Sequence, residues 1–305
     1  MFLPGSGVAL RAAVAGVGRG PAVTTAVDRQ LVQQAAAQRS VRAGGPALEV
    51  LPVDDCARVA VQTITDVVRP SIGLLALQVG NPEVGTLQPV GEAHDVCRGQ
   101  GVPLLLDATM AAGRLPLPDH WDALVLDARS WAGGDDVGVV VLRPGVRWHP
   151  AEQPDSPLLP LGAPSVAACA AAALGLEQAL ADLPERLARD TALTDRLWTA
   201  LGKVRDLQVH GEPHRRLPHV VGFSALYLDA EALLLELDRV GISVASGSAC
   251  AVDSGAPSHV LAAMGALTSG NIRVTLPMTA TDDDVDRLLD VVPPLVGRMR
   301  AEVGL

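Results

Sequence analysis

Lysine is nearly absent from this chain, which has one, Lys203, among its 305 residues. Aromatic residues are also scarce, at 2% of the chain, so any core must be built mainly from aliphatic side chains. Acidic residues outnumber basic ones by 34 to 24, which gives a net charge of −10. Proteins that bind nucleic acid or an anionic membrane surface present a basic face, so we expect neither partner here.

Long hydrophobic runs and paired cysteines are missing too. A membrane-spanning helix needs about 20 consecutive apolar residues, whereas runs such as Ile72–Leu77 and Val137–Leu142 have the length of buried strands. The N-terminus has neither the basic region nor the apolar core of a signal peptide, so we expect a cytoplasmic protein. The cysteines form no C-x-x-C pair, so we expect no metal site; they are Cys56, Cys97, Cys169 and Cys250.

The order of apolar segments predicts an α/β fold. Up to about residue 145, short apolar runs alternate with helical patterns, which is typical of a parallel sheet with helices on both faces. Residues 144–164 are rich in proline and predict a surface loop. An alanine-rich helix follows, and then strands and helices typical of a smaller α+β unit. We therefore expect a large α/β domain over residues 1–164, and a long helix with a small C-terminal domain over residues 165–305.

Three motifs follow one another in the C-terminal part. They are G-I-S-V-A-S-G-S-A-C at Gly241–Cys250, P-S-H-V-L-A-A-M-G at Pro257–Gly265 and G-N-I-R-V-T-L at Gly270–Leu276. Further segments of the same kind lie upstream, at Thr24–Asp28, Pro82–Pro89 and Leu106–Met110. Together they closely resemble the cysteine desulfurases of the class V aminotransferase superfamily.

This resemblance covers nearly the whole chain and implies a fold and an assembly. The implied fold is the type I fold of transferases that use pyridoxal phosphate (PLP), with a large parallel-sheet domain and a small C-terminal α+β domain. Family members are homodimers, so a dimer is expected. The N-terminal arm and first helix of the family have no counterpart in the sequence, so we expect that arm to be missing.

The resemblance also assigns roles to single residues. The family attaches PLP to a lysine through a Schiff base, and the matching position here is Ser130. Three functional positions are retained. Cys250 matches the cysteine that attacks the substrate sulfur, Arg273 the arginine that holds the substrate carboxylate, and Asp107 the aspartate that pairs with the pyridine nitrogen.

Other positions around the implied cofactor differ from the family. Arg29 replaces the histidine that stacks on the ring, Pro82 an asparagine beside the ring oxygen, and Met110 a glutamine. The family's S-x-H-K sequence is here D-A-R-S, from Asp127 through Arg129 to Ser130, and Gly7 and Ala163 replace two phosphate-binding threonines. The lysine, the stacking histidine, the asparagine and both threonines are thus replaced, and the Asp127 carboxylate would repel a phosphate. We therefore expect no bound PLP and no classical desulfuration.

Several interpretations remain open from the sequence. Arg29 and Arg129 either bind an anion or neutralise the two aspartates of the site. Arg273 either binds an anion or has a structural role, and Cys250 either carries sulfur or is an inherited residue. The favoured hypothesis is a persulfide carrier or scaffold that acts through Cys250, as a homodimer or as a heteromer with a sulfur-transfer protein. The alternative is an active desulfurase or another transferase with an altered PLP or anion site.

Overall fold

The structure of the protein is a computed structural model that describes residues 1–44, 48–134, 136–149, 162–247, 257–302 and 304. The chain divides into two compact units. Unit 1 comprises Met1–Asp54, Arg58–Gly80 and Leu87–Leu183. Unit 2 comprises Asp55–Ala57, Asn81–Thr86 and Pro184–Leu305, so it draws two short segments from the first third of the chain.

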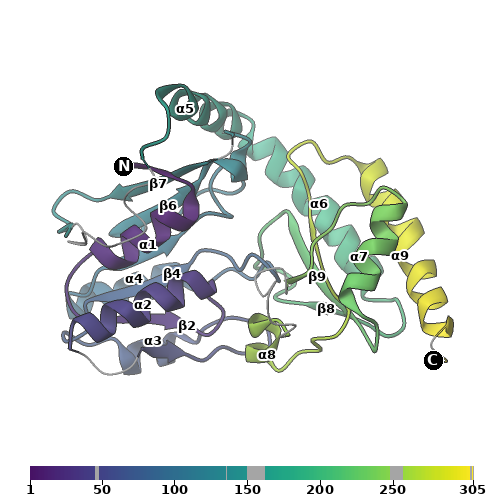
Figure 1. The fold of residues 1–305 in the computed structure, drawn as a ribbon, viewed down its shortest axis with the longest axis horizontal. Helices are drawn as coiled ribbons and strands as arrows, with labels where there is room; N and C mark the ends of the chain where they lie inside the picture. The colour runs from purple at the N-terminus through teal and green to yellow at the C-terminus, as the bar shows by residue number, and fades with distance from the viewer. Residues whose placement is uncertain (45–47, 135, 150–161, 248–256, 303, 305) are drawn as a thin grey trace. The chain divides into compact units, whose positions relative to one another are not determined.

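Unit 1 is built on a seven-stranded mixed sheet within the described residues, in the order β1-β7-β6-β5-β4-β2-β3 (Figure 1). Its strands are β1 (Phe2–Pro4), β2 (Ala22–Thr25), β3 (Glu49–Leu51), β4 (Leu74–Gln78), β5 (Leu104–Asp107), β6 (Ala123–Asp127) and β7 (Val137–Leu142). The strands from β3 to β6 are parallel, whereas β7 runs antiparallel to both β6 and β1. The core of the sheet is thus parallel, as expected, with an antiparallel edge.

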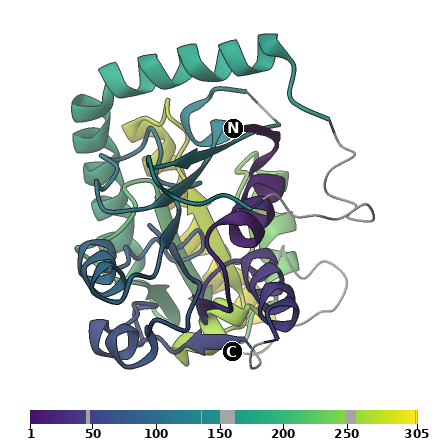
Figure 2. The ribbon, with the colours of Figure 1, turned by 90° about the vertical axis from the view of Figure 1, so that its left-hand side faces the viewer.

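Helices cover both faces of this sheet. They are α1 (Ser6–Gly16), α2 (Gln30–Arg42), α3 (Val61–Val67), α4 (Val90–Gln100), the 3-10 helix η1 (Ala128–Trp131) and α5 (Val166–Ala181). Figure 2 shows α1 and α2 on one side of the sheet and α3 and α4 on the other. Every residue of β4 and β5 is buried, which explains why these strands are continuous apolar runs and do not alternate.

A buried arginine joins the first two helices to the sheet. The guanidinium of Arg39, in α2, donates to the carbonyls of Val14 (2.7 Å) and Val17 (2.5 Å) at the end of α1. It also donates to the carbonyls of Gly20 (2.7 Å) and Gly73 (3.1 Å), which flank β2 and β4. A single side chain therefore satisfies four backbone acceptors where α1 ends and two strands begin.

Unit 2 contains a three-stranded antiparallel sheet, in the order β10-β9-β8 among the described residues. Its elements are α6 (Leu183–Leu201), β8 (Leu207–His210), β9 (Val220–Ala225), α7 (Ala230–Arg239), α8 (His259–Met264), β10 (Asn271–Thr275) and α9 (Asp282–Glu302). One buried cluster joins α6, α7 and α9 to the sheet, with Leu197, Phe223, Leu237, Ile272 and Val292 among its members. This is the small α+β unit that the sequence predicts.

The segment 81–86 is held within unit 2 by the buried carboxylate of Glu83. Its Oε2 accepts from the hydroxyl of Ser258 (2.8 Å), and its Oε1 accepts from the side-chain amide of Asn271 (2.6 Å). Gly222, in β9, lies so close that a Cβ there would be 2.7 Å from the Glu83 carbonyl oxygen. The first residues of the Pro82–Pro89 motif therefore belong to unit 2.

The two units divide at a different place from the expected domain boundary at residues 164 and 165. Helix α5 groups with unit 1, and the division falls between Leu183 and Pro184. The indole Nε1 of Trp131 donates to the carbonyl of Ala172, in α5, at 2.9 Å. Such tertiary contacts cannot be deduced from the proline-rich composition of residues 144–164, of which 150–161 lie outside the described residues.

The described residues contain no single helix that is long and apolar enough to cross a membrane. Helices α5 and α6 reach the length and apolar content of a membrane-spanning segment only as a bent pair.

Replacing Arg39 by methionine should lower the free energy of unfolding by ~3 kcal/mol, because four buried carbonyls lose their donor. Urea unfolding followed by circular dichroism measures this loss. Arg42→Met is the matched control, since Arg42 is exposed on the same helix and its loss should cost less than ~1 kcal/mol. Equal losses in the two variants would contradict the role of Arg39.

Candidate functional site

Several polar residues gather at one edge of the sheet of unit 1. Parallel strands end at the same edge, which is where open α/β sheets bind their ligands. Gln78 is the last residue of β4, Asp107 of β5 and Asp127 of β6, while Asp28 and Arg29 follow the end of β2. The structure therefore places three sequence-predicted site residues of unit 1, Arg29, Asp107 and Asp127, on one edge. Arg129 and Ser130 follow directly after Asp127.

Asp107 is held by two neighbours. Its Oδ1 accepts from the backbone N–H of Thr109 (3.0 Å) and from the Thr109 hydroxyl (2.5 Å). Its Oδ2 lies 3.4 Å from Nε of Arg29. The Arg29 guanidinium closes the network by donating to the Thr109 hydroxyl at 2.7 Å. Arg29 thus pairs with the aspartate at the sheet edge, which is one of the two alternatives that the sequence leaves open.

Asp127 has a second and tighter set of partners. Its Oδ2 accepts from the hydroxyl of Ser6 (2.6 Å) and from Nη2 of Arg129 (2.7 Å), and its Oδ1 accepts from Nε of Arg129 (3.1 Å). Burial alone would raise the pKa of Asp127, but the hydrogen bonds from Arg129 and Ser6 outweigh it and lower the pKa below its usual range. Asp127 is therefore an ionised carboxylate at neutral pH.

A close backbone approach brings Ser6 to Asp127. Gly138, in β7, is paired with Asp127 on one side and with Leu3 on the other. A Cβ at position 138 would lie 2.3 Å from the carbonyl oxygen of Gly5, the residue that caps α1 with a φ of 82°. Only glycine allows this contact, so Gly138 fixes the start of α1 beside the end of β6.

Ser130, which the sequence motif matches to the lysine position of the family, forms hydrogen bonds within unit 1. Its hydroxyl donates to the carbonyl of Ala112 at 2.6 Å, and its own carbonyl accepts from Nε of Arg114 at 2.8 Å. Met110 is half-buried and lies three residues after Asp107. The structure thus places a neutral, hydrogen-bonded side chain at position 130.

Asp28 is a buried carboxyl group at the same edge. Its Oδ2 accepts from the backbone N–H (2.7 Å) and hydroxyl (2.9 Å) of Thr25, and its Oδ1 accepts from the backbone N–H of Gln78 (3.2 Å). Burial is the largest influence and raises the pKa of Asp28 to about 7, although the bonds from Thr25 act in the opposite direction. The negative charge of Asp107 adds to the increase.

The remaining sequence-predicted residues belong to unit 2. Arg273 is half-buried in β10, and its Nη1 lies 3.5 Å from the carbonyl oxygen of Pro82. The backbone N–H of Arg273 donates to the carbonyl of Ala245 at 2.6 Å, in a bridge next to the sheet. Cys250 lies outside the described residues. The roles of Arg273 and Cys250 therefore stay predictions.

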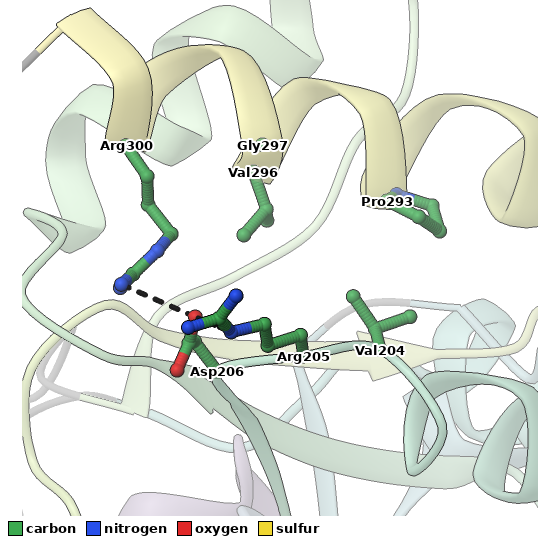
Figure 3. A pocket seen from close by; sticks show the side chains of 7 residues that line it. All are labelled: Val204, Arg205, Asp206, Pro293, Val296, Gly297 and Arg300. Atoms are coloured by element: carbon green, nitrogen blue, oxygen red, sulfur yellow. Dashed lines mark ion pairs between the residues drawn. The ribbon is translucent and has the colours of Figure 1, made fainter. Parts of the chain in front are cut away.

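A cavity of about 280 Å³ lies in unit 2, between α9 and the turn before β8 (Figure 3). Arg205 and Arg300 lie 3.4 Å and 3.2 Å from the same carboxylate oxygen of Asp206, so both cations are paired there. The cavity is lined by Val204, Arg205, Asp206, Pro293, Val296, Gly297 and Arg300. It contains none of the residues that the motifs single out.

Ser6 and Thr109, which donate to the two aspartates at the site edge, were not assigned a role from the sequence. Thr109 had a local signal, because a threonine two residues after an aspartate commonly donates to its carboxylate in a turn. Ser6 had none, since its bond to Asp127 joins residues that are 121 positions apart.

A model of the aminotransferase class-V family matches residues 1–288. A cysteine desulfurase of Archaeoglobus fulgidus is 31% identical over an alignment of 262 residues, which covers 83% of this chain and 68% of that protein. The chain belongs to the cysteine desulfurase family. A second cysteine desulfurase, from Methanosarcina thermophila, is 31% identical over 82% of this chain and 64% of its own length.

Solved structures of this family have the same fold. A NifS-like protein matches with a TM-score of 0.83 and 22% identity, over 97% of this chain and 82% of that chain. The apo structure of a cysteine desulfurase from Thermococcus onnurineus matches with a TM-score of 0.81 and 19% identity, over 97% of this chain and 79% of that chain. The expected type I fold is confirmed.

The comparisons correct the expectation that no cofactor is bound. That expectation came from counting the replaced residues, whereas the named relatives are cysteine desulfurases, a PLP-dependent family, and point to PLP. The residues present fit PLP in part. Asp107 ends β5 at the ligand-binding edge and offers a carboxylate to a ring nitrogen. Ser130 offers a hydroxyl group and no amine.

The raised pKa of Asp28 predicts a specific pH dependence. A carboxyl group whose pKa is higher in the folded state stabilises the fold fully below its unfolded pKa, near 3.8, and loses this contribution as the pH rises through about 7. The free energy of unfolding should therefore fall by up to ~1.4 kcal/mol per pH unit in this window. Urea titrations from pH 4 to pH 8 measure this slope.

Asp28→Asn is the comparison, because asparagine does not titrate and should remove this part of the slope. The difference between the two proteins isolates Asp28 from His210, whose pKa burial lowers to about 4 and whose slope has the opposite sign. Parallel profiles of the two proteins would contradict a raised pKa of Asp28.

Proposed function

We propose that this chain acts in sulfur transfer as a persulfide carrier through Cys250, and not by the classical desulfurase reaction. A role in sulfur transfer is supported by its relatives, which are named cysteine desulfurases. The observation that carries the proposal is Ser130, because the family attaches PLP to a lysine at this position.

Ser130 cannot replace that lysine chemically. A lysine amine bonds covalently to the PLP aldehyde and also moves a proton at the substrate Cα. A neutral serine hydroxyl that donates to the Ala112 carbonyl does neither. The single lysine, Lys203, follows α6 in unit 2. When bound, PLP supplies an electron sink for bond cleavage in an amino-acid substrate.

Sulfur transfer to Cys250 needs no cofactor. The Cys250 thiolate attacks the terminal sulfur of a persulfide on a donor protein and forms a new S–S bond. The S–S bond of the donor breaks, and the donor cysteine leaves as a thiolate. The transferred sulfur keeps its oxidation state and its proton, so the exchange requires no external oxidant or reductant. A second exchange of the same kind passes the sulfur to an acceptor.

The described cysteines provide internal references for this chemistry. Burial raises the pKa of the Cys97 thiol to about 12, with a further contribution from the charge of Asp122. Because the thiolate is the nucleophile, Cys97 should be inert. Cys56 and Cys169 are only half-buried, so they test whether transfer is selective for position 250.

The partner that this proposal requires is a desulfurase or another sulfur-transfer protein in a reducing compartment such as the cytoplasm. The exchange can take place within a heteromer or between a donor and a homodimer of this chain.

Incubation with an active cysteine desulfurase and cysteine should add ~32 Da, the mass of one sulfur, to the peptide that carries Cys250. Mass spectrometry of the alkylated, unreduced protein measures this gain. Cys250→Ser should abolish it, whereas Cys169→Ser should leave it unchanged. Sulfur on Cys56 or Cys169 to the same extent, or on no cysteine, would refute selective transfer to Cys250.

Ser130→Lys should restore covalent attachment of PLP, because it returns an amine to the family position. After incubation with PLP, borohydride reduction and denaturation, mass spectrometry should detect the cofactor on the variant and not on the wild type. A cofactor adduct on the wild type, together with release of sulfide from cysteine, would favour the alternative of an active desulfurase over a carrier.

A further inference from the structure

The first turn of α1 lies beside the ligand-binding edge of the sheet in unit 1, and its backbone favours a bound anion. Backbone N–H groups at the start of a helix lack partners within the helix and carry a partial positive charge. A Cβ at Gly5 or Gly7 would meet nothing within 4 Å, so the backbone there is open to a ligand. Phosphate groups commonly bind at such positions.

An internal carboxylate already lies beside this turn. The hydroxyl of Ser6, the first residue of α1, points to Asp127 and donates to it at 2.6 Å. Arg129 donates to the same carboxylate through both Nε and Nη2. Asp127 is buried, with 5% of its surface exposed, whereas the Arg129 side chain is 60% exposed. The two side chains suited to hold a phosphate are thus directed at a residue of the protein itself.

We propose that Asp127 acts as an internal anion that occupies Ser6 and Arg129, so that the site gains no affinity from the phosphate of a ligand and accepts pyridoxal as readily as PLP. The proposal rests on the cofactor site of the family and does not involve Cys250. It can therefore fail while sulfur transfer to Cys250 holds, and the reverse is also true.

The charges at this edge weaken the binding of the phosphate end of PLP and not of its ring. A phosphate next to α1 would have to share Arg129 with the Asp127 carboxylate. Both groups are negatively charged, so they would repel each other. The opposite end of the ligand is unaffected, because Asp107 has its own cation in Arg29. The effect should therefore fall on ligands with a phosphate and spare those without one.

The test is the affinity of PLP and of pyridoxal for the full chain, measured by isothermal titration calorimetry. The wild type should bind the two ligands with affinities within threefold of each other. Asp127→Ser should strengthen PLP binding at least tenfold and leave pyridoxal binding within twofold. Arg129→Ala, added to Asp127→Ser, should remove most of this gain, because the freed guanidinium is its source.

Two controls separate this effect from net charge and from folding. Asp119→Ser removes one negative charge from an exposed residue before β6, at the other end of that strand, and should not change PLP binding. Inorganic phosphate should compete with PLP in Asp127→Ser and not in the wild type. Melting temperatures identify any variant that fails to fold, and Asp127→Asn, which keeps the shape of the side chain, then takes its place.

The proposal is overturned if the wild type prefers PLP to pyridoxal by more than tenfold, or if removing the Asp127 charge leaves PLP affinity unchanged. It is also overturned if Asp119→Ser strengthens PLP binding as much as Asp127→Ser does, or if no variant binds either ligand.

Discussion

The requirement that a buried carboxylate be neutralised organises the ligand-binding edge of unit 1. Asp107 and Asp127 end adjacent strands, and each is paired with an arginine from a nearby turn. Burying either charge without its partner would cost several kcal/mol. The two carboxylates also connect elements: Arg29, which pairs with Asp107, is the N-cap residue of α2, and Ser6, which donates to Asp127, is the first residue of α1. The positions of both helices at this edge therefore depend on the two carboxylates.

Much of the fold could be predicted because its signals are local. The continuous apolar runs of β4 and β5 indicate strands covered on both faces, and both are fully buried. Ser258, in the motif at Pro257–Gly265, is a residue type that commonly caps helices, and its hydroxyl accepts from the backbone N–H of Leu261 at the start of α8. The pairing of Arg29 and Arg129 with the two aspartates was one of two alternatives, and simple charge balance favours it.

The features that could not be predicted depend on contacts between distant residues. The bond between Ser6 and Asp127 requires the close approach of Gly138 to Gly5, which no local pattern reveals. The raised pKa of Asp28 depends on burial by the assembled sheet. The expectation that no cofactor is bound failed for a different reason. A list of replaced residues does not show which non-covalent contacts with the cofactor remain. The family match, in contrast, extends over residues 1–288.

The segment 81–86 has a consequence for how this chain can be divided. It lies in sequence between β4 and α4 of unit 1, yet Glu83 is bonded to Ser258 and Asn271 of unit 2. A fragment that starts at Pro184 would lack this segment and leave the partners of Glu83 without their acceptor. No single break in the chain separates the two units intact. Recombination at one boundary therefore cannot replace either unit by that of another protein. During synthesis, residues 81–86 emerge long before Ser258 and Asn271, so the bonds of Glu83 can form only when most of the chain has been made.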